Sequence, residues 1–127
     1  MRLSCFAASF AVVLLSGCAT VAATDGQRLS LTSDEFRVYV ERVFREQNRV
    51  ADELAFALEA PGGQRGELAA AEQRLLEACA GVNELATARR DELRLGMRRS
   101  LSAAKTVPQC EASTRSAAES LTKARAQ

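Results

Sequence analysis

The chain has 127 residues, with 17 lysines and arginines against 16 aspartates and glutamates, a length that fits one domain. Its net charge of +1 produces no global field that would attract nucleic acid. The chain contains no histidine, so the commonest general base and the commonest metal ligand are both excluded.

The first residues have the pattern of a secretory signal. Arg2 supplies a short positive region, and residues 5–15 are apolar except for Ser9. This apolar run is about as long as the hydrophobic region of a signal peptide, and it is too short to span a bilayer as a helix.

The apolar run ends in the motif Leu15-Ser16-Gly17-Cys18. It resembles the lipobox of bacterial lipoproteins, in which a leucine and two small residues precede an invariant cysteine. The resemblance implies that residues 1–17 are a cleaved signal peptide and that Leu15, Ser16 and Gly17 are read by the lipoprotein signal peptidase. It also implies that Cys18 carries a diacylglyceryl group on its sulfur and an acyl chain, such as palmitate, on its new amino group. We expect no other cofactor.

Two alternatives stay open at this end of the chain. Cys18 is an ordinary thiol if the ordinary signal peptidase cuts near the small residues Val21-Ala22-Ala23, and the apolar run is a membrane anchor if it is not cleaved. Residue 19 is alanine, whereas an aspartate at this position resembles an inner-membrane retention signal in the lipoprotein family. The resemblance therefore favours the outer membrane over the inner membrane. We expect the protein to face the periplasm, and a surface orientation stays open.

Residues 18–31 are predicted to be a flexible tether. The stretch "ATVAATDGQRLSL" that follows Cys18 shows no lasting periodicity, and its thirteen residues reach about 45 Å when fully extended. We predict no strand anywhere in the chain.

Residues 32–127 are predicted to form an all-α domain, a bundle of three to four helices near 33–60, 67–88, 92–104 and 107–124. The first helix has the clearest start, with Thr32 as N-cap and Glu35 three residues later, and it should end at Ala60, before Pro61. Its apolar positions alternate in steps of four and three, like a heptad seam with one polar break. They are Phe36, Val40, Val43, Gln47, Val50, Leu54 and Ala57. This seam either packs on the protein's own helices, which we favour, or binds a partner.

Two cysteines remain if Cys5 leaves with the signal and Cys18 is lipidated. In an oxidising periplasm such a pair usually forms a disulfide, so we expect Cys79 and Cys110 to bond. Free buried thiols and a bond between chains are the alternatives. An unbroken helix from 67 to 104 would hold the two cysteines about 30 Å apart. A disulfide needs Cα atoms about 4.4–6.8 Å apart, so the chain should reverse near residues 88–91.

The returning helix at 92–104 is predicted to bury the stripe Leu93, Met97, Leu101 and Ala104, and Thr106 is predicted to cap the last helix. The stretch "ACAGVNELATARRDEL…VPQCE" is similar to segments of small uncharacterised proteobacterial lipoproteins. In these, two cysteines flank an asparagine and an Arg-Arg-Asp sequence. That resemblance implies no activity.

Little in the chain suggests catalysis. Ser100, Ser102 and Lys105 could supply a serine–lysine dyad, but their spacing alone is weak evidence. Most acidic residues lie three or four positions from an arginine, which is typical of solvated helix surfaces. Cys79 and Cys110 would need further ligands to hold a metal. We predict no catalytic residues and no metal site.

A basic stretch is the one local bias. Residues 89–99, "RRDELRLGMRR", hold two acids and five arginines: Arg89, Arg90, Arg94, Arg98 and Arg99. On one helix Arg90, Arg94 and Arg98 would share a side, and guanidinium groups suit phosphates and carboxylates. We favour a solvated face balanced by glutamates of neighbouring helices. A further alternative is a structural turn in which Asp91 caps the following helix.

These observations predict a membrane-anchored periplasmic lipoprotein with a non-enzymatic structural or interaction role in the cell envelope. The alternative is a binding module or inhibitor that recognises an anionic envelope polymer or a periplasmic protein. No nucleic-acid partner is expected. The ligand and the oligomeric state stay open.

Overall fold

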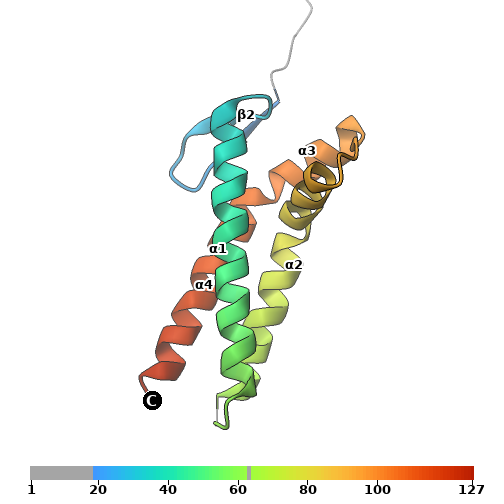
Figure 1. Cartoon of the computed structure of the whole chain (residues 1–127). Coiled ribbons are helices and arrows are strands. Elements are labelled where there is room, and N and C mark those ends of the chain that lie inside the picture. The colour runs from blue at the N-terminus through green and yellow to red at the C-terminus, as the bar shows by residue number, and fades with distance from the viewer. Residues whose placement is uncertain (1–18, 63) are drawn as a thin grey trace, which may run out of the picture.

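Four helices and a two-stranded hairpin make up residues 19–62 and 64–127, the part of the chain that the computed structural model describes. The predicted signal, the lipobox and Cys18 lie outside these residues. Three long helices, α1 (Asp34–Glu59), α2 (Arg65–Arg90) and α4 (Val107–Arg125), pack lengthwise on one another (Figure 1). The short helix α3 (Met97–Lys105) joins α2 to α4 at one end of the bundle. The predicted all-α bundle is confirmed, with a small hairpin added to it.

The prediction of a flexible tether without strands is wrong for residues 19–31. Strands β1 (Thr20–Ala22) and β2 (Arg28–Ser30) pair antiparallel, with Val21 opposite Leu29. Gly26 makes the tight turn between them at φ 85°, in the left-handed region that glycine adopts without a steric cost. Val21 is only 5% exposed, because the hairpin covers the start of α1 and joins its core. The strands form because α1 offers them an apolar surface to pack on. A sequence pattern of only three residues does not reveal that such a surface is present.

Helix α1 begins one residue later than predicted. Ser33 rather than Thr32 is the N-cap, and its Oγ accepts a hydrogen bond from the Phe36 N–H at 3.1 Å. The helix ends where predicted, with Ala60 as its C-cap before Pro61.

The heptad seam of α1 packs inside the bundle, so the favoured alternative is the observed one. Six of its seven positions are buried: Phe36, Val40, Val43, Gln47, Val50 and Leu54. Gln47, the polar break, donates from Nε2 to Oδ1 of Asn83 on α2 at 2.6 Å. A buried amide needs such a partner, and the pair sets one register between the two helices.

The chain reverses after α2 where the disulfide argument required, but the next helix starts later than predicted. The Leu93 N–H bonds to the Ala88 carbonyl and the Glu92 N–H to the Arg89 carbonyl, which is the Schellman closure of a helix end. Glu92 takes the left-handed conformation at φ 53°, so a helix cannot begin there. The predicted helix 92–104 is therefore Met97–Lys105, and Gly96 rather than Asp91 is its N-cap.

The predicted stripe of this helix is also wrong in its first half. Leu93 and Met97 are 61% and 82% exposed, while Ala103 and Ala104 are buried. Thr106 stands at the start of α4, but its hydroxyl donates to the Ala103 carbonyl at 2.7 Å and does not cap the helix. The Thr106 side chain therefore completes the C-terminal end of α3 and does not cap the start of α4.

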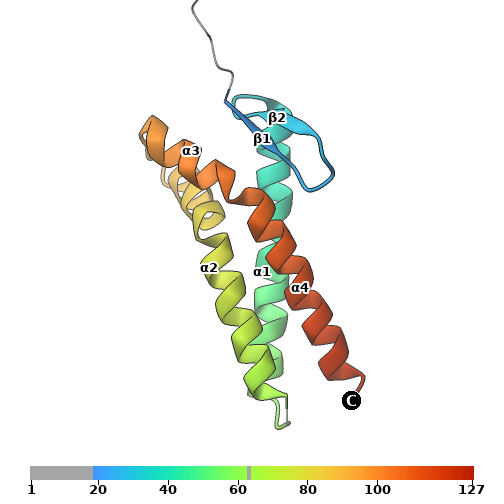
Figure 2. The same cartoon turned by 180° about the vertical axis from the view of Figure 1, so that it is seen from behind.

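Cys79 of α2 and Cys110 in the first turns of α4 form the predicted disulfide, with their Cα atoms 4.5 Å apart. Both side chains are fully buried. Figure 2 shows the reason from behind: α3 descends from the end of α2 and brings the start of α4 back to the middle of α2.

Candidate functional site

The five arginines of the predicted patch do not form one helical face. Helix α2 ends at Arg90 and α3 begins at Met97, so the expected row of Arg90, Arg94 and Arg98 on one helix is wrong. The physical reason is the left-handed Glu92, which turns the chain between the two helices.

Three of the five arginines face carboxylates. Arg89 donates to Glu41 of α1 at 2.9 Å, and Arg90 to the adjacent Asp91 at 2.8 Å. Nη2 of Arg99 lies 2.5 Å from Oε1 of Glu84, an oxygen that is buried and not aligned for a hydrogen bond. These pairs agree with the interpretation of a balanced, solvated surface. Within residues 19–62 and 64–127, Arg94 and Arg98 make no ion pair.

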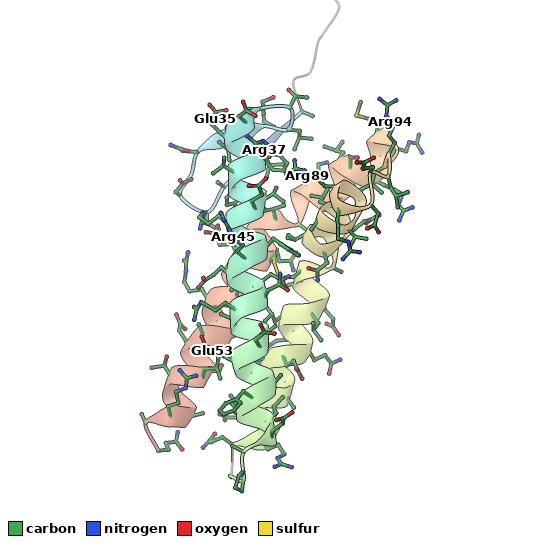
Figure 3. The ribbon with its side chains drawn as sticks, in the orientation of Figure 1. Glu35, Arg37, Arg45, Glu53, Arg89 and Arg94 are labelled. Carbon is green, nitrogen blue, oxygen red and sulfur yellow. A yellow bond between two sulfur atoms is a disulfide. The ribbon has the colours of Figure 1, made fainter. Side chains whose placement is uncertain are left out.

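An apolar groove of about 410 Å³ lies beside the paired arginines, between α1, the end of α2 and α3. Phe36, Phe44 and Leu85 are among its apolar lining, and its charged lining residues are Arg37, Glu41, Arg89 and Arg90. Glu41 lies 3.5 Å from Arg37 and 2.9 Å from Arg89, so these charges largely satisfy one another. Figure 3 shows Arg37 and Arg89 close together in this upper half of the bundle.

A polar cluster around Glu111 was not predicted. Glu111 of α4 accepts three hydrogen bonds from two other elements: one from Thr24 of the hairpin turn at 2.5 Å, and two from α1, from the Tyr39 hydroxyl and from Arg42, each at 2.8 Å. The Arg42 guanidinium also lies 5.3 Å from the centre of the Tyr39 ring. The cluster ties the hairpin, α1 and α4 together.

Local sequence carries little signal for this cluster, because its members are up to 87 positions apart. For the hairpin a signal exists: Asp25-Gly26 stands between Val21 and Leu29, and such a pair between apolar residues favours a turn.

The cluster shifts the pKa values of two of its members. Burial raises the pKa of Glu111, but the hydrogen bonds from Thr24, Tyr39 and Arg42 outweigh it and hold that pKa below its ordinary value. Burial, and then the hydrogen bond to Glu111, raise the pKa of Tyr39 well above its ordinary value. The cluster is therefore a charged carboxylate held by a neutral phenol, a stable arrangement with no group tuned for proton transfer near neutral pH.

These shifts predict how stability depends on pH. Because the folded pKa of Glu111 is lowered, its contribution is complete above the unfolded value of about 4.3 and is lost as the pH falls through the folded value. The contribution of Tyr39 is complete below about pH 10 and is lost above it, because its folded pKa is raised. We expect Glu111→Gln to lower the free energy of unfolding at pH 7 by about 1 kcal/mol and to flatten the acid limb.

Urea unfolding between pH 3 and pH 11 measures both limbs. Glu119→Gln, an exposed position on the same helix, is the matched control and should leave the acid limb unchanged. Tyr39→Phe should remove the part of the alkaline loss that belongs to Tyr39. An acid limb that is identical in the Glu111→Gln variant and the unsubstituted protein would contradict this account.

No protein-family model matches the chain, and comparisons with curated proteins and with solved structures found no match. Across residues 19–62 and 64–127, no helix has the length and apolarity to cross a bilayer. The same residues contain no group of three or more cysteine or acidic side chains placed to hold a metal ion.

Proposed function

We propose that the protein is a lipid-anchored envelope protein with a non-enzymatic structural or interaction role. The anchor is a diacylglyceryl group and an N-acyl chain on Cys18, the protein resides at the outer membrane, and the bundle faces the periplasm. The observation that carries the proposal is the motif Leu15-Ser16-Gly17-Cys18 directly before the fold. β1 begins at Thr20, so cleavage before Cys18 leaves every described helix and strand intact.

Two further features support this function. A buried disulfide between Cys79 and Cys110 suits an oxidising compartment such as the periplasm. The Glu111 cluster and the paired arginines satisfy their charges within the fold, as expected of structural groups. The alternative, a binder of an anionic polymer through all five arginines, has less support because Arg89, Arg90 and Arg99 already face carboxylates.

Intact mass spectrometry of the protein from its native membrane tests the anchor. We expect the mass of residues 18–127 plus the acyl groups, and a gain of two hydrogens on reduction. The Cys18→Ser variant should lack the acyl groups, since serine offers no thiol for the diacylglyceryl group. An unlipidated mass that begins after residue 18 would remove the proposal.

A further inference from the structure

The chain enters the fold at the same end of the bundle as the turn between α2 and α3. The Ala19 carbonyl accepts a hydrogen bond from the Leu31 N–H at 3.1 Å, and α1 begins just beyond Leu31. Helix α2 runs antiparallel to α1, so its last turn lies beside the first turns of α1, where Arg89 meets Glu41. Figures 1 and 2 show the hairpin and the α2–α3 turn together at one end and the C-terminus at the other.

This arrangement changes what a lipid on Cys18 would do. A flexible tether of thirteen residues would let the bundle stand up to about 45 Å from the bilayer. Because the hairpin folds that segment, only the step from Cys18 to Ala19, about 3.8 Å between Cα atoms, separates the anchor from the fold. The end that carries the α2–α3 turn is therefore held at the level of the lipid headgroups. This step rests on the proposed anchor.

The α2–α3 turn, defined as residues 92–98 and therefore including the first two residues of α3, has the surface chemistry of a membrane interface. Leu93 and Met97 are two of the most exposed large apolar side chains among the described residues. Arg94 and Arg98 alternate with them, and Glu92 is the one acid in the turn. Figure 3 places Arg94 at the tip of this end.

Three of the nearby acids pair with other arginines, whereas Glu35 and Glu92 make no ion pair among the described residues. Asp34 pairs with Arg37, Asp91 with Arg90 and Glu84 with Arg99. The two arginines of the turn thus keep their charge for an outside anion. Apolar side chains that enter the bilayer boundary while arginines meet anionic headgroups are the combination by which peripheral surfaces bind membranes.

We propose that the α2–α3 turn is a membrane-contact surface, in which Leu93 and Met97 enter an anionic bilayer and Arg94 and Arg98 bind its headgroup phosphates. The lipid and this turn then hold the bundle at two points on the same membrane. Two attachments close together reinforce each other, because the anchor keeps the turn at high effective concentration near the surface.

Tryptophan reporters test the contact, because the chain contains no tryptophan of its own. The Met97→Trp variant places the reporter in the turn. The Phe56→Trp variant is the matched control, since Phe56 is 77% exposed near the far end of α1. Each full chain is purified from its native membrane, checked by intact mass and placed in vesicles of phosphatidylcholine and phosphatidylglycerol with brominated acyl chains.

We expect the emission of the Met97→Trp variant to move to shorter wavelength and to be quenched, while that of the Phe56→Trp variant stays unchanged. Adding Arg94→Gln and Arg98→Gln to the Met97→Trp variant should lower the equilibrium constant for membrane contact about fivefold for each arginine. A change from anionic to neutral vesicles should also lower this constant. Arg45→Gln with Arg115→Gln removes the same charge elsewhere on the exposed surface and should leave the quenching unchanged.

The outcomes separate the contact from the anchor. A lipidated Met97→Trp variant that is no more quenched than the Phe56→Trp variant overturns the contact and leaves the anchor standing. An unlipidated mass would rule out the anchor. In that case, quenching of the Met97→Trp variant by added vesicles would still support the turn as a membrane surface. The absence of such quenching would overturn the membrane-contact proposal. If Arg94→Gln and Arg98→Gln weaken co-sedimentation with purified peptidoglycan while Met97→Trp stays unquenched, the turn binds a polymer and the proposal is wrong.

Discussion

Replacing Cys79 and Cys110 together with alanine should lower the free energy of unfolding by about 3–4 kcal/mol. The bond joins residues 31 positions apart, and a loop of this length restricts the unfolded chain by about that much on the chain-entropy model. The stabilisation of a small domain is only about 5–15 kcal/mol in total, so this is a large share. The melting temperature should fall by about 15 °C, which calorimetry of the double variant measures.

Reduction provides the matched control for this prediction. A reducing agent should lower the melting temperature of the unsubstituted protein to near that of the Cys79→Ala/Cys110→Ala variant, and should leave the variant itself unchanged. Both side chains are fully buried, so the reductant acts through opened molecules and needs time to equilibrate. If intact mass shows the bond fully reduced and the melting temperature is unchanged, the bond contributes nothing to stability.

Gly81→Ala should destabilise the protein by about 1–2 kcal/mol, although alanine is the better helix former by about 1 kcal/mol. A Cβ on Gly81 would stand 2.2 Å from Oγ1 of Thr106 and 3.1 Å from Cα of Ala103. The hydroxyl can rotate, but the backbone of α3 can move only if the contact between α2 and the α3–α4 junction opens. The disulfide two residues away resists that movement.

Gly66→Ala in the same helix is the matched control, because a Cβ there meets nothing within 4 Å. It should stabilise the protein by about 0.5–1 kcal/mol, so the two glycine variants should differ by about 1.5–3 kcal/mol with opposite signs. Adding Thr106→Ala to Gly81→Ala should recover part of the loss, which a double-mutant cycle in urea measures. Equal stabilisation by both alanines would show that α2 and α3 do not approach this closely.

The part of the fold that sequence predicted well depends on patterns within one segment. The heptad spacing from Phe36 to Leu54 predicted which side of α1 is buried, because helical periodicity alone places those side chains on one face. Pro61 predicted the end of that helix. The requirement that Cys79 and Cys110 meet predicted the reversal near residue 90, because the length of a helix and the reach of a disulfide are fixed quantities.

The candidate site was less predictable from sequence. The arginine stretch could be seen in the sequence, but its interpretation as one helical face depended on where α3 begins. The left-handed Glu92 moves that start to Met97, and glutamate is not a residue that signals such a conformation. The same shift leaves Leu93 and Met97 exposed beside Arg94, so the proposed contact surface exists only in the folded chain.

The sequence by itself thus determined the lengthwise helices, the buried face of α1 and the pairing of the cysteines, since each is a local periodicity or a distance limit. Only the tertiary structure decided that residues 19–31 fold as a hairpin and that Glu111 of α4 collects donors from the hairpin turn and α1. Three-residue strands and single carboxylates have no stable local structure of their own, because their stabilisation comes from surfaces that distant segments provide. The same is true of Gly81, whose role is visible only where another helix lies against it.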